Sequence, residues 1–317
     1  MPAAAALTVD APEERVHRLR AGDLEVELAV DTRRLEARFG PRFDRSAAVT
    51  SVRFRGHEYL DPRGLCDEFG LRGLGVLGYD DAAPDGGEFL KIGVGVLRRD
   101  DSGDYTFVRS WPVAASLPVT VSARPQELLV EQRSPGCHGF AYRLSKRYEV
   151  APAGTLTVEY EVGNVGGRAF AFEHYNHNFF SFDGVASDGR YALRPAFALG
   201  RDGNREWSLR GGTLRLAAAA PAGRGSYFGV ETAGVPVCDN RFTLSHAGGL
   251  AVAVSGDFPL ARFAVWADAA AFCPEAFFRA SVPPDGRVRW RHVYGFSPVG
   301  FPPETGLRPS TSQPLPP

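Results

Sequence analysis

The chain has 317 residues, of which 44% are hydrophobic and 23% charged, and its formal net charge is −1. This composition excludes global disorder, and the scattering of its basic residues among carboxylates excludes a nucleic-acid partner. No stretch approaches the roughly 20 apolar residues that span a bilayer, and the first residues lack a signal-peptide pattern. We therefore expect no membrane partner and a cytoplasmic location.

Strands joined by turns are the predicted elements along the chain. The window from Glu13 to Leu19 is the best helical segment, and flanking breakers limit it to a turn or two. Apolar and polar residues alternate at 24–28, 156–162 and 288–296, which predicts half-buried strands. Gly and Pro, which favour turns, recur at short intervals between the predicted strands. The pattern predicts an all-β fold, an antiparallel sandwich or a barrel.

The chain reads as one domain, residues 1–301, followed by a Pro-rich tail at 302–317, because no linker or internal repeat divides it. Residues 61–88, rich in Gly and Asp, are expected to be irregular. The segment is long enough to form one wall of a binding site. The four cysteines lie far apart and predict buried free thiols, neither a zinc site nor a disulfide scaffold. Gly93 and Gly95 do not complete a phosphate-binding loop, so we expect no cofactor.

A dense polar cluster occupies residues 173–184, where His174, Asn176, His177 and Asn178 lie among aromatic residues. Buried polar groups need hydrogen-bond partners, and the hydroxyls of a ligand on a groove floor would supply them. The alternative is a hydrogen-bonded polar corner of the fold. Two histidines three residues apart point to opposite faces of a strand, so metal ligation is the weaker functional hypothesis.

A second candidate is Glu275, which is surrounded by apolar and aromatic residues in 272–278. Desolvation there would raise the pKa of its carboxyl group and make it a usable general base. The alternative is a surface glutamate in a loop beside Pro274.

Residues 176–182 resemble the Asn-His-x-Tyr-Phe-Asn-Leu motif of the aldose 1-epimerase (galactose mutarotase-like) superfamily, in which the histidine is the general acid. Glu275, the Pro-Gly turn at 283–286 and the strand at 290–296 resemble that family's carboxylate base, turn and final strand. The resemblance implies a large antiparallel β-sandwich with an open cleft across one sheet. It makes His177 the acid and Glu275 the base.

The chain departs from this family upstream of the central motif, where members place another histidine and an arginine. Here Lys91 is the candidate, as a sugar-binding residue or as a lysine that guards a sheet edge. Asp239 resembles a family carboxylate near the site, although a plain turn is its other interpretation. With His174, Asn176 and Asn178, these residues form the expected substrate-binding set.

The reaction that the resemblance implies is interconversion of sugar anomers, with Glu275 and His177 about 5 to 8 Å apart across the ring. His177 should face the cleft through a bulge, because simple alternation sends it away from His174 and Asn176. A single lysine favours a neutral sugar, whereas convergence of Arg42 or Arg109 would favour an anionic one. A non-catalytic sugar-binding domain and another sugar epimerase or lyase remain alternatives, as do monomer and homodimer.

Overall fold

The structure is a computed structural model that describes residues 15–30, 39–220, 223–232 and 235–298. Within these residues, nine strands form one large sheet in the order β1-β2-β3-β5-β14-β22-β21-β18, with β4 paired to β3 alone. Their bounds are β1 Arg15–Ala21, β2 Leu24–Val30, β3 Ala47–Phe54, β4 His57–Glu58, β5 Leu60–Phe69, β14 Phe170–Phe180, β18 Ser226–Glu231, β21 Arg262–Ala267 and β22 Phe272–Val282.

Ten further described strands form a second sheet, in the order β10-β11-β12-β13-β23-β20-β19-β15-β17-β16. Their bounds are β10 Val119–Arg124, β11 Glu127–Arg133, β12 Tyr142–Ala151, β13 Thr155–Asn164, β15 Tyr191–Pro195, β16 Trp207–Arg210, β17 Thr213–Leu216, β19 Arg241–His246, β20 Ala251–Gly256 and β23 Arg287–Ser297. Neighbouring strands in the central part of both sheets pair in antiparallel register. The predicted large antiparallel β-sandwich is confirmed.

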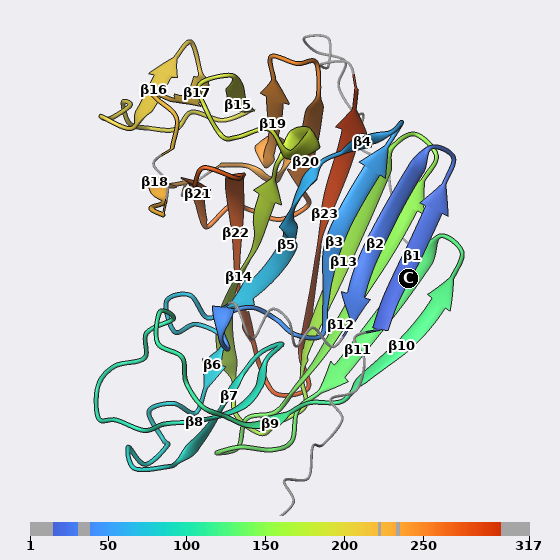
Figure 1. Cartoon of the computed structure of the whole chain (residues 1–317). Helices are drawn as coiled ribbons and strands as arrows, with labels where there is room; N and C mark the ends of the chain where they lie inside the picture. Colours follow the sequence, from blue (N-terminus) through green and yellow to red (C-terminus); the bar gives the residue numbers. More distant parts are fainter. Residues whose placement is uncertain (1–14, 31–38, 221–222, 233–234, 299–317) are drawn as a thin grey trace, which may run out of the picture.

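A small lobe lies at the lower end of β14 in Figure 1 and consists of a third sheet. Its strands are β6 Val76–Leu77, β7 Glu88–Lys91, β8 Gly95–Arg98 and β9 Val113–Ser116. Two short 3-10 helices complete the described elements, η1 Phe182–Gly184 and η2 Val237–Asp239. No helix within the described ranges is long and apolar enough to cross a membrane.

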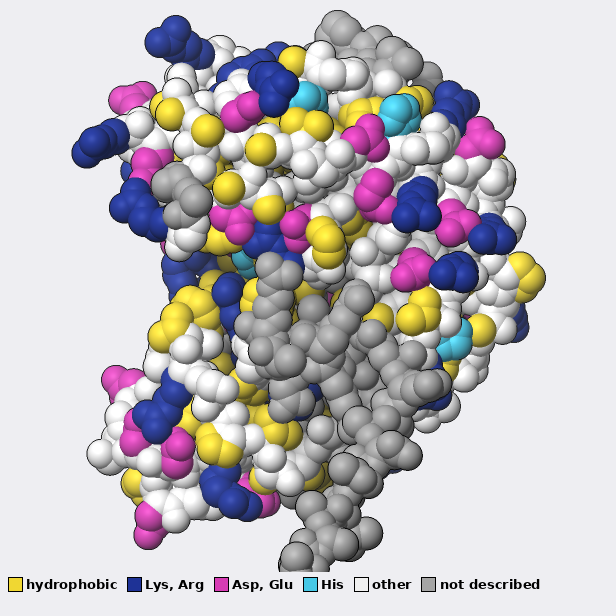
Figure 2. All heavy atoms as spheres, viewed as in Figure 1, with side chains coloured by type: hydrophobic (Ala, Val, Ile, Leu, Met, Phe, Trp, Pro, Cys, Tyr) yellow, Lys and Arg dark blue, Asp and Glu magenta, His cyan; other side chains and the backbone are white. Residues whose placement is uncertain are grey.

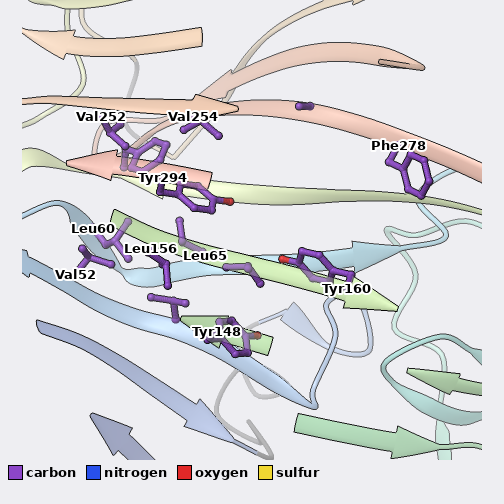
Figure 3. Close-up of a cluster of buried hydrophobic side chains, with 14 of the residues drawn as sticks. Val52, Leu60, Leu65, Tyr148, Leu156, Tyr160, Val252, Val254, Phe278 and Tyr294 are labelled. Atoms are coloured by element: carbon purple, nitrogen blue, oxygen red, sulfur yellow. The ribbon is translucent and has the colours of Figure 1, made fainter. Parts of the chain in front are cut away.

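The main core fills the space between the two large sheets, as Figure 3 shows. Leu60 and Leu65 of β5 belong to the same buried cluster as Leu156 of β13 and Tyr294 of β23. Alternation explains this arrangement, because every second residue of a strand points to the same face of its sheet. Burial of this continuous apolar layer provides the main stabilisation of the sandwich.

The structure corrects two expectations about local structure, and a third concerns residues that it does not describe. The window from Glu13 to Leu19 is not helical where it is described, because Arg15–Ala21 pairs with β2 as a strand. Residues 61–88 are not irregular throughout, because residues up to Phe69 belong to strand β5. This strand is largely buried and lies between β3 and β14 in the large sheet. The expected tail at 302–317 lies outside the described residues.

The four cysteines are free thiols, as expected, but they are not all buried. Cys66 and Cys273 are buried, Cys137 is partly exposed and Cys238 is exposed.

Strand β14 decides which polar side chains can form a site. Its even-numbered residues face the second sheet: His174 accepts a hydrogen bond from Trp290, Asn176 donates one to Tyr160, and Asn178 accepts one from Tyr294. Its odd-numbered residues Tyr175, His177 and Phe179 therefore point to the opposite face. There they line a hollow on the outside of the sandwich.

Candidate active site

His177 and Glu275 lie on neighbouring strands, β14 and β22. The two strands pair at both ends in one register, with His174 opposite Phe278 and Phe180 opposite Phe272, and this register places His177 opposite Glu275. Directly opposite residues point to the same face of a sheet, so the two side chains meet. Nε2 of His177 lies 3.3 Å from Oε1 of Glu275.

The backbone ladder between these strands is interrupted beside the pair. Pro274 has no N–H to contribute to it. Instead, the Nδ2 atom of Asn178 donates a hydrogen bond of 2.7 Å to the carbonyl oxygen of Pro274. The side chain of Asn178 thus joins the two strands where they carry the candidate acid and base, which is a supporting position, not a ligand-binding one.

The hollow above the pair has a volume of about 320 Å³. Figure 2 shows the outline of the molecule indented between the upper part and the lower lobe, with basic side chains along the indentation. Aromatic side chains supply much of its wall, namely Phe39, Phe107, Phe179, Tyr227 and Trp266. A larger hollow of about 480 Å³ is lined by polar residues 204–206 and Arg224, and it contains no such acid–base pair.

His177 is held within the aromatic wall. Its imidazole stacks on Phe179, with ring centroids 4.1 Å apart and planes 17° apart, and it forms a T-shaped pair with Trp266 at a centroid distance of 5.3 Å. Its Nδ1 atom is buried without a hydrogen-bond partner among the described residues. Burial lowers the pKa of His177 well below its usual value, and the positive charges of Arg42 and Arg63 add to this effect. The imidazole is therefore neutral near pH 7.

Glu275 is shifted in the opposite direction. Burial raises the pKa of its carboxyl group to about 8, since the charged form is poorly solvated there. Arg42 and Arg262 oppose the shift, and the negative charge of Glu68 adds to it. Near pH 7 the pair therefore consists of a carboxylic acid beside a neutral imidazole. It holds one transferable proton, the same number as a carboxylate beside an imidazolium.

Arg42 lines the hollow and is fixed there by Glu68 and Tyr175. Its Nε atom donates to Oε2 of Glu68 at 2.8 Å, and its Nη2 atom donates to the Tyr175 hydroxyl at 3.0 Å. The Tyr175 hydroxyl donates in turn to the same Glu68 oxygen. The Arg42 side chain keeps 26% of its surface exposed, so it borders the open space.

Arg63 also lines the hollow, and each of its three guanidinium nitrogens donates to a carboxylate. Its guanidinium binds both carboxylate oxygens of Asp268, at 2.6 and 3.0 Å, and Asp61 at 2.5 Å. The guanidinium carbon lies 4.3 Å from the centre of the Phe179 ring. Arg63 therefore supplies positive charge and a packing surface, while two carboxylates balance its charge.

The expected separation and the expected bulge were both wrong. The pair lies 3.3 Å apart, not about 5 to 8 Å. Cross-strand neighbours on one face have Cβ atoms only about 4.5 to 5.5 Å apart, which brings their side chains into contact. His177 reaches the hollow by ordinary alternation, and the register shift of β14 against β5 lies beyond it, between Asn178 and Phe180.

The structure places His174, Asn176 and Asn178 away from the hollow, between the two sheets. Each is at most 3% exposed. His174 and Asn176 both bind the carboxylate of Asp67, at 3.1 and 2.5 Å. The expectation that these three residues contact substrate is therefore corrected: the even positions of β14 satisfy buried polar groups inside the sandwich.

Lys91 and Asp239 also do not line the hollow. Lys91 is 1% exposed, and its ammonium group donates to the carbonyl oxygen of Arg42 at 2.7 Å. It is neither an edge-strand guard nor a substrate contact. Asp239 lies in the short helix η2, which agrees with the alternative of a plain turn.

Sequence reasoning did not select Arg63, Tyr175, Phe179 or Trp266, which all line the hollow. For Tyr175 and Phe179 a signal was present, because they share the parity of His177 along one strand. Arg109 pairs with Asp100 and is not among the lining residues, whereas Arg42 is one of them. Within the described part of the chain, no three His, Cys, Asp or Glu side chains gather as metal ligands would.

Comparisons with known proteins support the fold. No protein-family model matches the chain, and no curated protein matches it. A putative aldose 1-epimerase from Escherichia coli K12 has a similar solved structure, with a TM-score of 0.55 and 12% identity, covering 90% of this chain and 99% of that one.

Two further solved structures are similar over most of both chains. A protein from Synechocystis sp. PCC 6803 has a TM-score of 0.56 and 14% identity, covering 93% of this chain and 99% of its own. A galactose mutarotase related enzyme from Lactobacillus acidophilus has a TM-score of 0.57 and 12% identity, covering 89% of this chain and 97% of its own. The chain has the β-sandwich fold of the aldose 1-epimerase (galactose mutarotase-like) superfamily. At this identity the likeness concerns the fold, and function must be argued from the site.

Proposed function

We propose that the protein is an aldose 1-epimerase-like isomerase that interconverts the anomers of a free sugar in the hollow above His177 and Glu275. The observation that carries the proposal is the contact between these two groups, 3.3 Å apart and both facing an open hollow. They hold one transferable proton between them. Proton removal at one oxygen and proton delivery at another is the chemistry that anomer interconversion requires.

The proposed reaction needs no group beyond this pair. The base takes the proton of the anomeric hydroxyl while the acid protonates the ring oxygen, so the bond between the anomeric carbon and the ring oxygen breaks and an aldehyde forms. The aldehyde rotates, and ring closure by the reverse transfers gives the other anomer. Because both reacting oxygens are bonded to the same carbon, an acid and a base in contact can serve both. Each transfer contributes roughly 10²- to 10⁴-fold.

The protonation state of the pair reverses the roles that the family resemblance implies. With the proton resting on Glu275, this residue protonates the ring oxygen and Nε2 of His177 accepts the hydroxyl proton. In the opposite direction of the reaction the same two groups exchange roles. Burial favours this neutral resting pair, because an ion pair would need solvation that the aromatic surroundings do not provide.

A neutral sugar suits the wall and the charge balance. Trp266 lines the hollow and is partly exposed, so its indole presents a flat apolar surface on which the C–H face of a sugar ring can pack. Two arginine side chains border the hollow, but Arg42 pairs with Glu68, and Arg63 pairs with two aspartates. Arg42 does line the hollow, which by itself would favour an anionic sugar, but the paired carboxylates balance both guanidinium charges and support a neutral substrate.

The experiment that tests the function is mutarotation of a panel of freshly dissolved aldoses, followed by polarimetry or NMR, with and without the protein. Each neutral sugar is paired with its phosphate or uronate. Acceleration of a neutral sugar supports the proposal in full. Faster turnover of the anionic partner contradicts the neutral-sugar claim, and binding without acceleration of any sugar favours a non-catalytic sugar-binding domain.

A further inference from the structure

The chain uses lysine at only two of its 36 basic positions, Lys91 and Lys146. Both lysines are buried, at 1% and 0% exposure. They come from different sheets, Lys91 from β7 of the lobe and Lys146 from β12 of the sandwich. Nevertheless, the ammonium groups of both bind the same short segment, residues 42–47.

Lys146 has one acceptor for each of its three N–H groups. Its Nζ atom lies 2.7 Å from Oδ2 of Asp44, 2.9 Å from Oδ2 of Asp67 and 2.6 Å from the carbonyl oxygen of Ala47. Two of these acceptors belong to segment 42–47. An ammonium group is a compact charge with three rotatable donors, whereas a guanidinium is a flat fork, so arginine would not fit this site.

Lys91 fixes the other end of the segment. Its Nζ atom donates to the carbonyl oxygen of Arg42 at 2.7 Å and lies 3.9 Å from Oε1 of Glu68. The second oxygen of Glu68 accepts from the side chain of Arg42. Arg42 is therefore held at its backbone by Lys91 and at its side chain by Glu68.

This segment forms part of the wall of the candidate active site. Arg42 lines the hollow, and the ring of Phe43 meets His177 edge-on with centroids 5.7 Å apart. Further backbone bonds hold the segment, from the N–H of Asp44 to the carbonyl of Asp67 and from that of Arg45 to Gly93. A shift of the segment would move both Arg42 and Phe43 relative to the acid–base pair.

We propose that Lys91 and Lys146 are positioning residues, which hold segment 42–47 so that Arg42 and Phe43 keep their places beside His177 and Glu275. That Arg42 and Phe43 serve catalysis rests on the proposed function. That the two lysines hold segment 42–47 concerns the fold alone. An experiment can therefore contradict either statement without the other.

The first test is Lys91→Met, which keeps most of the side-chain volume but removes the hydrogen bond to Arg42. We expect kcat/KM for mutarotation to fall about 10-fold or more, because small misplacement of a site is costly. The matched control is Asn164→Ala, which removes one buried hydrogen bond, to Val282, and two partly buried ones, with Arg168 and Gly166, far from the hollow. If the control loses as much kcat/KM at a comparable loss of Tm, Lys91 is only a stability residue and the proposal fails.

The second test does not depend on turnover. In the wild-type protein the Nε–H of Arg42 is bonded to Glu68 and should exchange slowly with solvent, as measured by NMR on arginine-labelled protein and assigned from its loss in Arg42→Gln. We expect Lys91→Met to accelerate this exchange about 10-fold or more, by local opening, and Asn164→Ala to leave it unchanged. Unchanged exchange in Lys91→Met contradicts the positioning role even if the protein proves inactive on every sugar.

Lys146 needs a milder variant, because Lys146→Met would leave two buried carboxylates without a counterion and would prevent folding. Asp44→Asn keeps the bonds of Lys146 to Asp67 and Ala47 and removes its ion pair with the segment. It also disturbs the hydrogen bonds that Ser46 donates to the Asp44 carboxylate. We expect faster exchange of the Arg42 Nε–H than in the wild type, by a smaller factor than in Lys91→Met. An unchanged rate would remove Lys146 from the proposal.

Discussion

Glu275 lies one strand away from His177, with 3.3 Å between Oε1 and Nε2, and burial drives both side chains toward their neutral forms. The two effects have one cause, since an aromatic wall with little access to water disfavours charge on either group. Titratable groups whose environments shift their pKa values away from the usual range are frequent at functional sites.

Glu275→Gln removes the proton that the pair shares while keeping the shape of the side chain. We expect turnover to fall at least about 10²-fold, the lower range for one positioned proton-transfer group. Sugar binding should persist, because the aromatic wall is unchanged. Polarimetry measures the first effect, and tryptophan fluorescence or calorimetry measures the second. Activity equal to the wild type would mean that the acid is another group.

The pH dependence of activity should follow the proton content of the pair. The pKa of Glu275 is raised to about 8, so activity should fall as the pH rises through about 8 and the carboxyl group loses its proton. The pKa of His177 is lowered well below 6.5, so activity should persist below that pH. A pH–rate profile measures both limbs. A nitrogen NMR spectrum that shows a charged His177 at pH 7 would contradict the assigned resting state.

Stability should also depend on the ionisation of Glu275. Its pKa is about 8 in the folded protein, against a usual value of 4.5, so the folded state binds the proton more tightly. This contribution to the free energy of unfolding is complete below about pH 4.5 and is lost as the pH rises to about 8. Glu275→Gln lacks this pH-dependent contribution, so the variant should gain stability relative to the wild type as the pH rises across this range, by at most about 5 kcal/mol. Denaturant titrations at pH 4.5 and 8.5 measure the difference, and an equal difference at both pH values would contradict it.

Trp266→Ala should weaken substrate binding more than chemistry. The indole lines the hollow and packs in a T-shaped arrangement with the His177 ring, without contributing a proton. Loss of about 1.4 kcal/mol of stacking and burial corresponds to a tenfold rise in KM, and kcat should change less. Trp266→Phe is the matched variant, because it keeps an aromatic surface. A larger fall in kcat than rise in KM in Trp266→Ala would assign the indole to positioning of His177.

Alternation along the sequence was sufficient to predict an all-β fold, while the choice of a sandwich over a barrel came from the family resemblance. The parity of apolar residues at 24–28, 156–162 and 288–296 reports which face of each strand is buried, and β2, β13 and β23 follow it. The motif at 176–182 and the solitary Glu275 also selected the two residues that meet in the hollow. Strand periodicity and the apolar surroundings of Glu275 are local properties of the sequence, whereas His177 was selected by the resemblance to the family motif.

Only the tertiary structure decided which parity of β14 faces the hollow. Both parities carry polar residues, and both faces of this central strand are buried, so the sequence offers no dry and wet side to compare. The second sheet takes the even positions, and His177 is left on the other face. Similarly, Lys91 lies in an apolar strand whatever its role, and its contact with Arg42, 49 residues away, is fixed by packing of the lobe. Contacts between distant segments, and the burial that sets the charge of Glu275, arise only when the sheets come together, which is why the sequence alone did not determine them.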